Sequence, residues 1–181
     1  MRAPLVIIPG RNNSGPQHWQ SLWQKRTPDA LRIAPTTWAI PELNDWMGAL
    51  ESTLRASPSP PILVGHSIGS LLAICWGQHR NTSRIKGMFL VAPPDFRREG
   101  FSVPTFRNIS EIPIPHPTLI VASETDPHCH IDIAKHMATA WGAGFISVGD
   151  RGHISTELQN GAWEEGWYLL EAFAAEIQVE I

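Results

Sequence analysis

Residues 62–73 read Ile-Leu-Val-Gly-His-Ser-Ile-Gly-Ser-Leu-Leu-Ala, a Gly-x-Ser-x-Gly pentapeptide between two apolar runs. The first run predicts a buried strand and the second an apolar helix. A serine on a sharp turn from strand to helix forms a nucleophile elbow, whose flanking residues are glycines because a Cβ would collide with neighbouring backbone. Gly65 and Gly69 occupy those flanking positions, so the sequence predicts that Ser67 is a nucleophile.

Short, nearly continuous apolar runs recur along the chain and are typical of strands covered on both faces. They lie at residues 5–8, 31–34, 61–64, 85–92, 118–122 and 144–148. Helical patterns are predicted for residues 16–25, with Pro16 in the first turn, and for residues 44–54, 67–78, 131–141 and 163–177. This alternation predicts an α/β fold with about six mostly parallel strands and helices on both faces.

Length and composition indicate one globular domain over residues 1–181. Hydrophobic residues make up 43% and charged residues 17% of the chain, and no apolar run approaches the roughly 18 residues of a membrane span. The net charge of −3 and the lack of a basic stripe argue against nucleic-acid binding. The apolar stretch near the N-terminus is too short for a signal peptide. Two cysteines fit a reducing compartment, so we expect a cytoplasmic protein without a membrane association.

A serine nucleophile needs a base and an acid that orients the base. In α/β-hydrolases these follow in the order Ser, Asp or Glu, His, each after a strand. His153 follows the last predicted strand, and Asp126 follows the preceding one, so both are the preferred candidates. Asp95 and Glu124 remain alternatives for the acid. His66 stands at the variable position of the elbow and is expected to point away from Ser67.

The oxyanion that forms when a serine attacks a carbonyl needs hydrogen-bond donors that are already in place. One is expected to be the backbone N–H of Ile68 at the start of the predicted helix. The other is expected from the glycine-containing loop after the first strand, through the N–H of Arg11 or Asn12. This loop lacks the ending of a P-loop and the spacing of a dinucleotide-binding fingerprint, which disfavours the alternative of a phosphate site.

Residues 93–117 form the longest irregular stretch, and its position after a strand favours a loop that faces substrate. Packing beneath the loop is the alternative for its aromatic residues. The resulting pocket is expected to be shallow and to suit small or short-chain acyl substrates. The candidate pocket residues are Trp38, Phe96, Phe101, Phe106, His128 and Trp163.

Residues 126–130 read Asp-Pro-His-Cys-His and offer several metal-binding side chains. Adjacent ligands in one short loop rarely surround a tetrahedral zinc ion, and no second cluster supplies partners. We therefore expect no metal and no cofactor, with His128 and His130 near the rim of the pocket.

Four segments together resemble small α/β-hydrolase-fold proteins akin to retinoblastoma-binding protein 9 and its bacterial relatives. The matching segments are Pro9-Gly10 with His18-Trp19-Gln20 and Trp23; Gly65 to Gly69; Ser123 with Asp126-Pro127; and Gly152-His153-Ile154 with Gly161, Trp163, Glu165 and Gly166. The resemblance implies a minimal serine-hydrolase fold without a cap domain and a triad of Ser67, Asp126 and His153. Two positions depart from the family pattern, His128 where an aromatic is usual and Ser155 where Asn is common. No Leu-x-Cys-x-Glu pattern is present, so binding to the retinoblastoma protein is not transferred.

The sequence thus predicts a carboxylesterase-like serine hydrolase that acts on small carboxylic esters or amides through an acyl-enzyme. Two alternatives remain open. One is a binding or scaffold protein that keeps the fold and turns over little. The other is a peptidase, thioesterase or acyltransferase that uses the same site. Protein partners are not indicated by the sequence.

Overall fold

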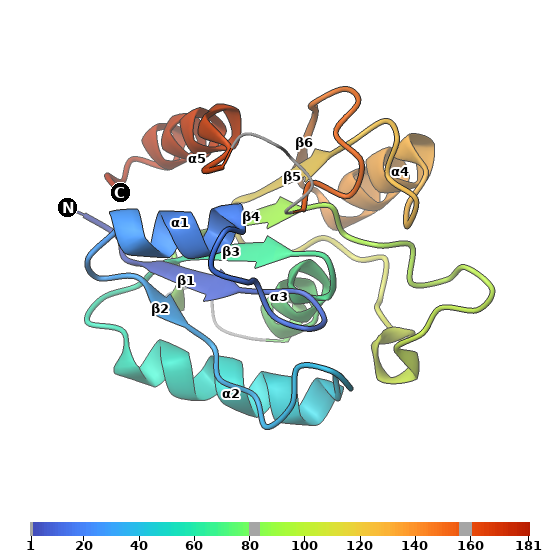
Figure 1. Cartoon of the computed structure of the whole chain (residues 1–181), viewed down its shortest axis with the longest axis horizontal. Coiled ribbons are helices and arrows are strands. Elements are labelled where there is room, and N and C mark those ends of the chain that lie inside the picture. Colours follow the sequence, from blue (N-terminus) through green and yellow to red (C-terminus); the bar gives the residue numbers. More distant parts are fainter. Residues whose placement is uncertain (1, 80–83, 156–160) are drawn as a thin grey trace.

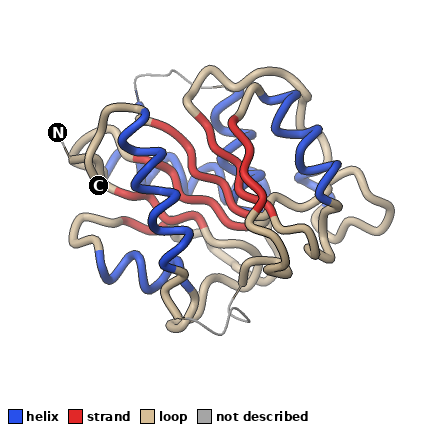
Figure 2. Tube along the Cα trace, turned by 90° about the horizontal axis from the view of Figure 1, so that it is seen from above, coloured by secondary structure: helices blue, strands red, loops and turns tan. Residues whose placement is uncertain are grey.

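The computed structural model describes residues 2–79, 84–155 and 161–181. Within these residues a single sheet has six strands in the order β2-β1-β3-β4-β5-β6, and every neighbouring pair is parallel. Figures 1 and 2 show the strands side by side with helices on both faces. The strands are β1 (Leu5–Ile8), β2 (Leu31–Arg32), β3 (Ile62–His66), β4 (Gly87–Val91), β5 (Thr118–Ala122) and β6 (Gly144–Ser147). The predicted α/β architecture is therefore confirmed.

Strand β1 illustrates why the central strands are continuous apolar runs. Successive side chains point to opposite faces of a sheet, and helices cover both faces here. Leu5 and Ile7 belong to the core on one side, and Val6 and Ile8 to the core on the other. All four side chains are fully buried.

Two helical layers enclose the sheet (Figure 1). Helices α1 (Trp19–Arg26) and α5 (Glu164–Glu176) cover one face, where the indole rings of Trp23 and Trp163 stack. Helices α2 (Leu43–Ala56), α3 (Ile68–Gln78) and α4 (Ile131–Trp141) cover the other face. Most of the tryptophans are therefore core residues. In the described part of the chain, no helix is both long and apolar enough to span a bilayer.

The strand order reverses between β1 and β3, because β2 lies on one side of β1 and the later strands lie on the other. In open parallel sheets, a crevice forms at such a point beyond the carboxyl ends of the strands, and ligands bind there. The loop that begins at Gly10 and the turn at Ser67 follow these two strands. The topology therefore brings both predicted catalytic segments to one crevice.

The start of α1 differs from the prediction. The helix begins at Trp19 rather than at Pro16, and His18 is its N-cap residue with an extended backbone. The His18 imidazole accepts a hydrogen bond from the N–H of Gln20, which ends the turn at residues 16–18 and starts the helix. Strand β2 is also shorter than predicted, with two residues at the edge of the sheet.

Candidate active site

Ser67 occupies a strained turn between β3 and α3. Its backbone torsions are φ 54° and ψ −124°, in the region with positive φ that residues with a Cβ rarely adopt. A Cβ at Gly69 would lie 2.1 Å from the carbonyl oxygen of Ile8, and a Cβ at Gly65 would lie 2.9 Å from Cα of Ser70. Both glycines are thus sterically required for this turn.

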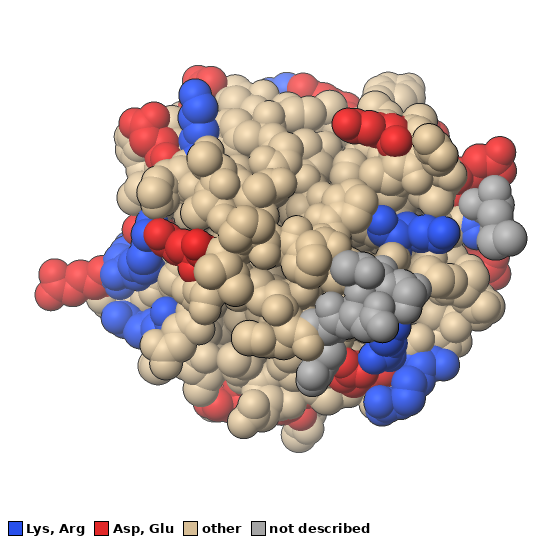
Figure 3. All heavy atoms as spheres, turned by 180° about the vertical axis from the view of Figure 1, so that it is seen from behind, with Lys and Arg blue, Asp and Glu red and all other residues tan. Residues whose placement is uncertain are grey.

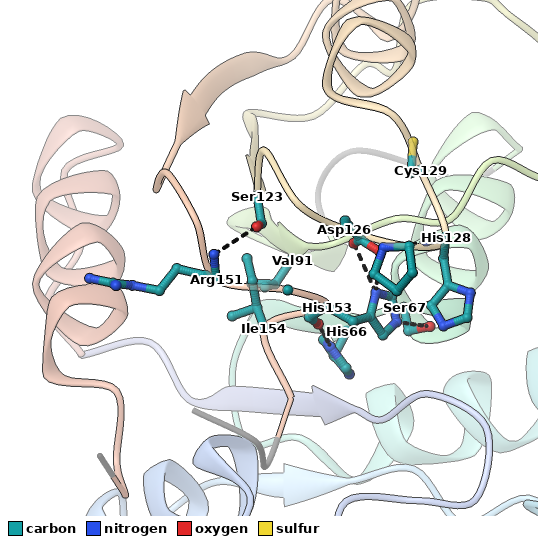
Figure 4. A network of polar contacts seen from close by, with 12 residues as sticks. His66, Ser67, Val91, Ser123, Asp126, His128, Cys129, Arg151, His153 and Ile154 are labelled. Atoms are coloured by element: carbon teal, nitrogen blue, oxygen red, sulfur yellow. Dashed lines mark hydrogen bonds and ion pairs between the residues drawn. The ribbon is translucent and has the colours of Figure 1, made fainter. Parts of the chain in front are cut away.

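The structure brings together Ser67, His153 and Asp126 from three separate loops (Figure 4). The Oγ atom of Ser67 lies 2.9 Å from Nε2 of His153. The Nδ1 atom of His153 lies 2.8 Å and 3.0 Å from the two carboxylate oxygens of Asp126. A carboxylate only accepts hydrogen bonds, so the Nδ1 position carries the proton and Nε2 is free to accept the proton of the serine hydroxyl.

The Asp126 carboxylate is nearly enclosed, with 3% of its side chain exposed, whereas the His153 side chain is 16% exposed. The Oδ1 atom of Asp126 also accepts a hydrogen bond from the backbone N–H of His128 at 2.8 Å. The carboxylate is therefore fixed by its own loop as well as by the imidazole, and it holds the ring of His153 in one orientation.

Several hydrogen bonds fix the loop that carries His153. The N–H of Arg151 donates to Oγ of Ser123 at 2.9 Å, and the indole N–H of Trp19 donates to the carbonyl of Ile154 at 2.8 Å. The ring of His66 donates from Nε2 to the carbonyl oxygen of His153 at 3.0 Å. His66 therefore bonds to the backbone of His153 and not to the hydroxyl of Ser67.

The alternative acids have other partners. Asp95 accepts the N–H of Arg97 at 3.0 Å, and Glu124 accepts the hydroxyl of Ser147 at 3.1 Å. Asp150 is exposed and accepts the hydroxyl of Thr125. The geometry therefore favours Asp126 as the acid.

The structure separates the two candidates for the second oxyanion donor. The N–H of Asn12 donates to the carbonyl of Trp38 at 2.9 Å and is not available, so this alternative is corrected. Among the described residues, the backbone N–H groups of Arg11 and Ile68 have no such partner. Ile68 is the first residue of α3, where backbone N–H groups remain unpaired within the helix.

A cavity of about 490 Å³ opens in front of Ser67. Segment 93–117 contributes to its wall, as do the loop after β1 and the catalytic loops. The described lining residues are Gly10, Arg11, Asn13, His18, His66, Ser67, Ile68, Pro94, Arg98, Gly100, Phe101, Ser102, Val103, His128, His153 and Ser155.

Of the six predicted pocket residues, Phe101 and His128 line this cavity. The other four do not, because their rings pack into the core. Phe96 stacks on Trp141, and Trp163 stacks on Trp23. Trp38 and Phe106 both contact Trp46. The prediction that these four residues line the pocket is therefore corrected. Packing beneath the loop, the alternative for its aromatic residues, therefore applies to Phe96 and Phe106.

Two imidazoles flank the ring of His153, and a third lies next to one of them. The ring centroids of His66 and His128 lie 5.0 Å and 4.5 Å from that of His153, and the ring of His18 lies 5.0 Å from that of His66. Burial lowers the pKa of His18 to about 4, with additional effects of Arg32 and His153. Burial also lowers the pKa values of His66 and His128. These three rings are therefore neutral at pH 7.

The side chains of segment 126–130 diverge rather than converge. Asp126 turns to His153, His130 caps the start of α4, and Cys129 is buried. No group of three or more potential metal ligands occurs among the residues that the structure describes. The side chains of this segment therefore do not converge on a common point.

Sequence reasoning missed the cavity positions of His18, His66 and Arg98. The predicted loop 93–117 was a signal for Arg98, because that loop was expected to face substrate. Nothing local marks His18, whose approach to the site depends on where α1 packs. The ring of His66 is held at the cavity by its hydrogen bond to the carbonyl of His153, a residue 87 positions away in the sequence.

Comparison with known proteins places these observations in a family. The sequence matches the family described as serine hydrolase over residues 5–172. No curated protein sequence matches the chain. A structure described as a YdeN-like hydrolase from Pectobacterium atrosepticum is 35% identical, covers 97% of this chain and 92% of its own, and superposes with a TM-score of 0.89.

Two more distant structures share the fold. The ydeN gene product of B. subtilis is 19% identical with a TM-score of 0.78, and the alignment covers 96% of this chain and 99% of that one. Esterase 2 of Thermogutta terrifontis is 16% identical with a TM-score of 0.74, and the alignment covers 98% and 83% of the two chains. The family match spans nearly the whole chain and includes the elbow at Ser67, so the protein belongs to the serine hydrolase family.

Proposed function

We propose that this serine hydrolase cleaves small carboxylic esters, or the related amides, with Ser67 as the nucleophile. The observation that carries the proposal is the chain of contacts from Ser67 Oγ through His153 to Asp126, at the wall of an open cavity. A hydroxyl is a weak nucleophile, and an adjacent oriented base is what activates it. This arrangement supports acyl transfer as the reaction.

In the first step, Oγ of Ser67 attacks the carbonyl carbon of the ester while its proton passes to Nε2 of His153. The negative charge that develops on the carbonyl oxygen is stabilised by the N–H groups of Ile68 and Arg11. Collapse of this intermediate breaks the bond to the alcohol, which takes the proton from His153. Asp126 keeps the imidazole in the correct tautomer and stabilises its charged form.

In the second step, a water molecule gives a proton to Nε2 of His153 and attacks the acyl-enzyme. Collapse of the new intermediate releases the carboxylic acid, and Oγ of Ser67 regains its proton from His153. The cavity of about 490 Å³ lies within the range of about 300–1,000 Å³ that is usual for small-molecule sites, so it has room for a small ester.

The test is hydrolysis of 4-nitrophenyl acetate by the wild type, by Ser67→Ala and by a control, Ser52→Ala, at an exposed position of α2. We expect Ser67→Ala to lower kcat by roughly 10⁶, as in other enzymes that lose the serine of a triad. Ser52→Ala is expected to retain wild-type turnover. Equal rates for Ser67→Ala and the wild type would contradict the proposal. An absence of turnover and of an initial burst with several acyl esters would favour a binding protein instead.

A further inference from the structure

Two arginines line the cavity in front of Ser67. Among the described lining residues, Arg11 and Arg98 are the side chains that carry a full charge at pH 7, and none is an aspartate or glutamate. The chain as a whole carries an excess of acidic residues and a net charge of −3. The charge of the cavity is therefore opposite to that of the protein.

Both guanidinium groups are oriented by backbone carbonyls and, among the described residues, keep donors for a ligand. Nη1 of Arg98 donates to the carbonyl of Pro127 at 3.1 Å, and Nε of Arg11 donates to the carbonyl of Ala39 at 2.9 Å. In the described chain, neither group forms an ion pair. Each therefore has further N–H donors that no carboxylate of the described residues occupies.

Several other arginines of this protein do form ion pairs. Arg97, next to Arg98 in the sequence, pairs with Glu111 and lies near Asp95, and Arg84 pairs with Glu51 at 2.7 Å. On the face shown in Figure 3, basic and acidic residues lie around the margin with both signs represented. Among the described arginines, Arg2, Arg32 and Arg107 also form no ion pair, so what distinguishes Arg11 and Arg98 is that they line the cavity.

Arg98 lines the same cavity as Ser67, His128 and His153. Burial is the main cause that lowers the pKa of His128, and the charges of His153 and Arg98 contribute to it, while Asp126 opposes it. The ring of His128 packs edge-on against that of His153 with centroids 4.5 Å apart. A group bound at Arg98 therefore lies in the same cavity as the scissile bond and not on a separate surface.

We propose that the substrate carries an anionic group, a carboxylate on its acyl or alcohol portion, and that Arg98 and Arg11 bind this group while Ser67 attacks the ester. The inference rests on the proposed esterase function. Guanidinium groups match carboxylates in geometry and charge, and Phe101 and Val103 provide apolar wall for the intervening carbon chain. The substrate class is thus small monoesters of dicarboxylic acids, or hydroxy acids whose hydroxyl is acylated and whose carboxylate is free.

Two matched substrate pairs test this class. The acyl pair is the 4-nitrophenyl monoester of adipic acid and 4-nitrophenyl hexanoate, which have the same number of acyl carbons. The alcohol pair is 4-acetoxybenzoate and its methyl ester. The readout is the ratio of kcat/KM for the anionic ester to kcat/KM for the neutral one, after subtraction of spontaneous hydrolysis.

For at least one pair we expect a wild-type ratio of about 10. This ratio corresponds to a free energy between that of an exposed ion pair and that of a hydrogen bond to a charged group. Arg98→Gln is expected to lower this ratio several-fold, because Arg11 remains, Arg98→Glu to lower it further, and Arg98→Lys to keep most of it. Added salt is expected to lower the wild-type ratio, because it screens exposed charges. The matched control is Arg97→Gln, which removes the same charge from the adjacent position and is expected to keep the wild-type ratio.

Wild-type ratios at or below 1 for both pairs would overturn the anionic substrate class, as would ratios that do not respond to either Arg98→Gln or Arg98→Glu. Hydrolysis of the neutral esters that depends on Ser67 would leave the proposed function standing in those cases. If no ester of either pair is hydrolysed in a way that depends on Ser67, the proposed function fails and this inference fails with it.

Discussion

Ser67 adopts a backbone conformation that is costly for a residue with a side chain, at about 1–3 kcal/mol for such outliers in general. The surrounding contacts maintain it, because the N–H of Ser67 donates to the carbonyl of Val91 at 3.0 Å and Gly10 passes close to its Cβ. The result is that Oγ faces both His153 and the cavity. The strain at this residue is therefore linked to the presentation of the hydroxyl.

The acid of the triad is testable by a paired substitution. Asp126→Asn is expected to lower kcat by up to about 10⁴, because an amide permits the wrong tautomer of His153. Asp95→Asn is expected to leave the rate near the wild-type value, since Asp95 bonds to Arg97 instead. Initial rates with an activated ester measure both. A near-normal rate for Asp126→Asn with a large loss for Asp95→Asn would reverse the assignment.

At the residue scale, chain order pointed to Ser67, Asp126 and His153, the three side chains that the structure brings into contact, because in α/β-hydrolases each position of the triad follows a particular strand. The pocket residues were less predictable. An aromatic ring such as Phe96 or Phe101 looks the same in the sequence whether it fills the core or lines the cavity. Only the fold of loop 93–117 separates them, with Phe96 against Trp141 and Phe101 at the cavity.

Among the elements, α3 and β1 approach each other most closely at Gly69, where the helix backbone meets the carbonyl of Ile8. Gly48 in α2 is the opposite case, since a Cβ there would meet nothing within 4 Å. Gly69 stands at the start of α3 against β1, whereas Gly48 lies inside α2 with open space beside it. Alanine substitutions at the two positions therefore distinguish the steric requirement for glycine from the general preference of helices for alanine.

We expect Gly69→Ala to lower the free energy of unfolding by at least about 2 kcal/mol, because the helix must move away from β1. Gly48→Ala is expected to raise the free energy of unfolding by about 0.5–1 kcal/mol, the usual gain in a helix interior. Urea denaturation measures both values. Destabilisation of equal size in the two variants would contradict the role assigned to Gly69.

Strand and helix positions followed from apolar patterns to within a few residues, and β1, β5 and α4 match their predicted ranges. The start of α1 did not, because Pro16 is favoured in a first helical turn and sequence patterns do not reveal a histidine cap. The hydrogen bond between His18 and Gln20 forms only in the folded geometry. Boundaries set by side-chain caps are therefore the least predictable part of the elements.

For the whole molecule, the buried neutral histidines connect stability with pH. His18 has a folded-state pKa of about 4, below the ordinary value near 6.5. Between these values the unfolded chain binds more protons than the folded one. The stabilising contribution of neutral His18 is therefore fully present above pH 6.5 and is lost as the pH falls toward 4. His66 contributes in the same direction, since burial lowers its pKa as well.

We expect His18→Asn to reduce this dependence by up to about 1.4 kcal/mol per pH unit between pH 6.5 and 5, the effect of one proton. Asparagine also serves as an N-cap, so the start of α1 is preserved. The measurement is the free energy of unfolding from urea denaturation at several pH values. A slope identical to that of the wild type would show that His18 does not remain neutral in the folded protein.

The sheet order was predictable only in part from the sequence. Alternating strands and helices implied parallel pairing, but the reversal of order between β1 and β3 depends on which side each crossover takes. That reversal creates the crevice where the loop of Gly10 meets the elbow. The unpaired basic groups of the cavity also belong to this scale, because Arg11 and Arg98 come from loops far apart in the sequence.

The central claim is that Ser67 is the nucleophile, and covalent labelling tests it most directly. A fluorophosphonate probe is incubated with the wild type and with Ser67→Ala, and the modified peptide is identified by mass spectrometry. Nucleophile, base and oxyanion donors act together on such a probe, so we predict one phosphonyl group on Ser67 in the wild type and none in Ser67→Ala. Labelling of another residue that persists in Ser67→Ala would contradict the account.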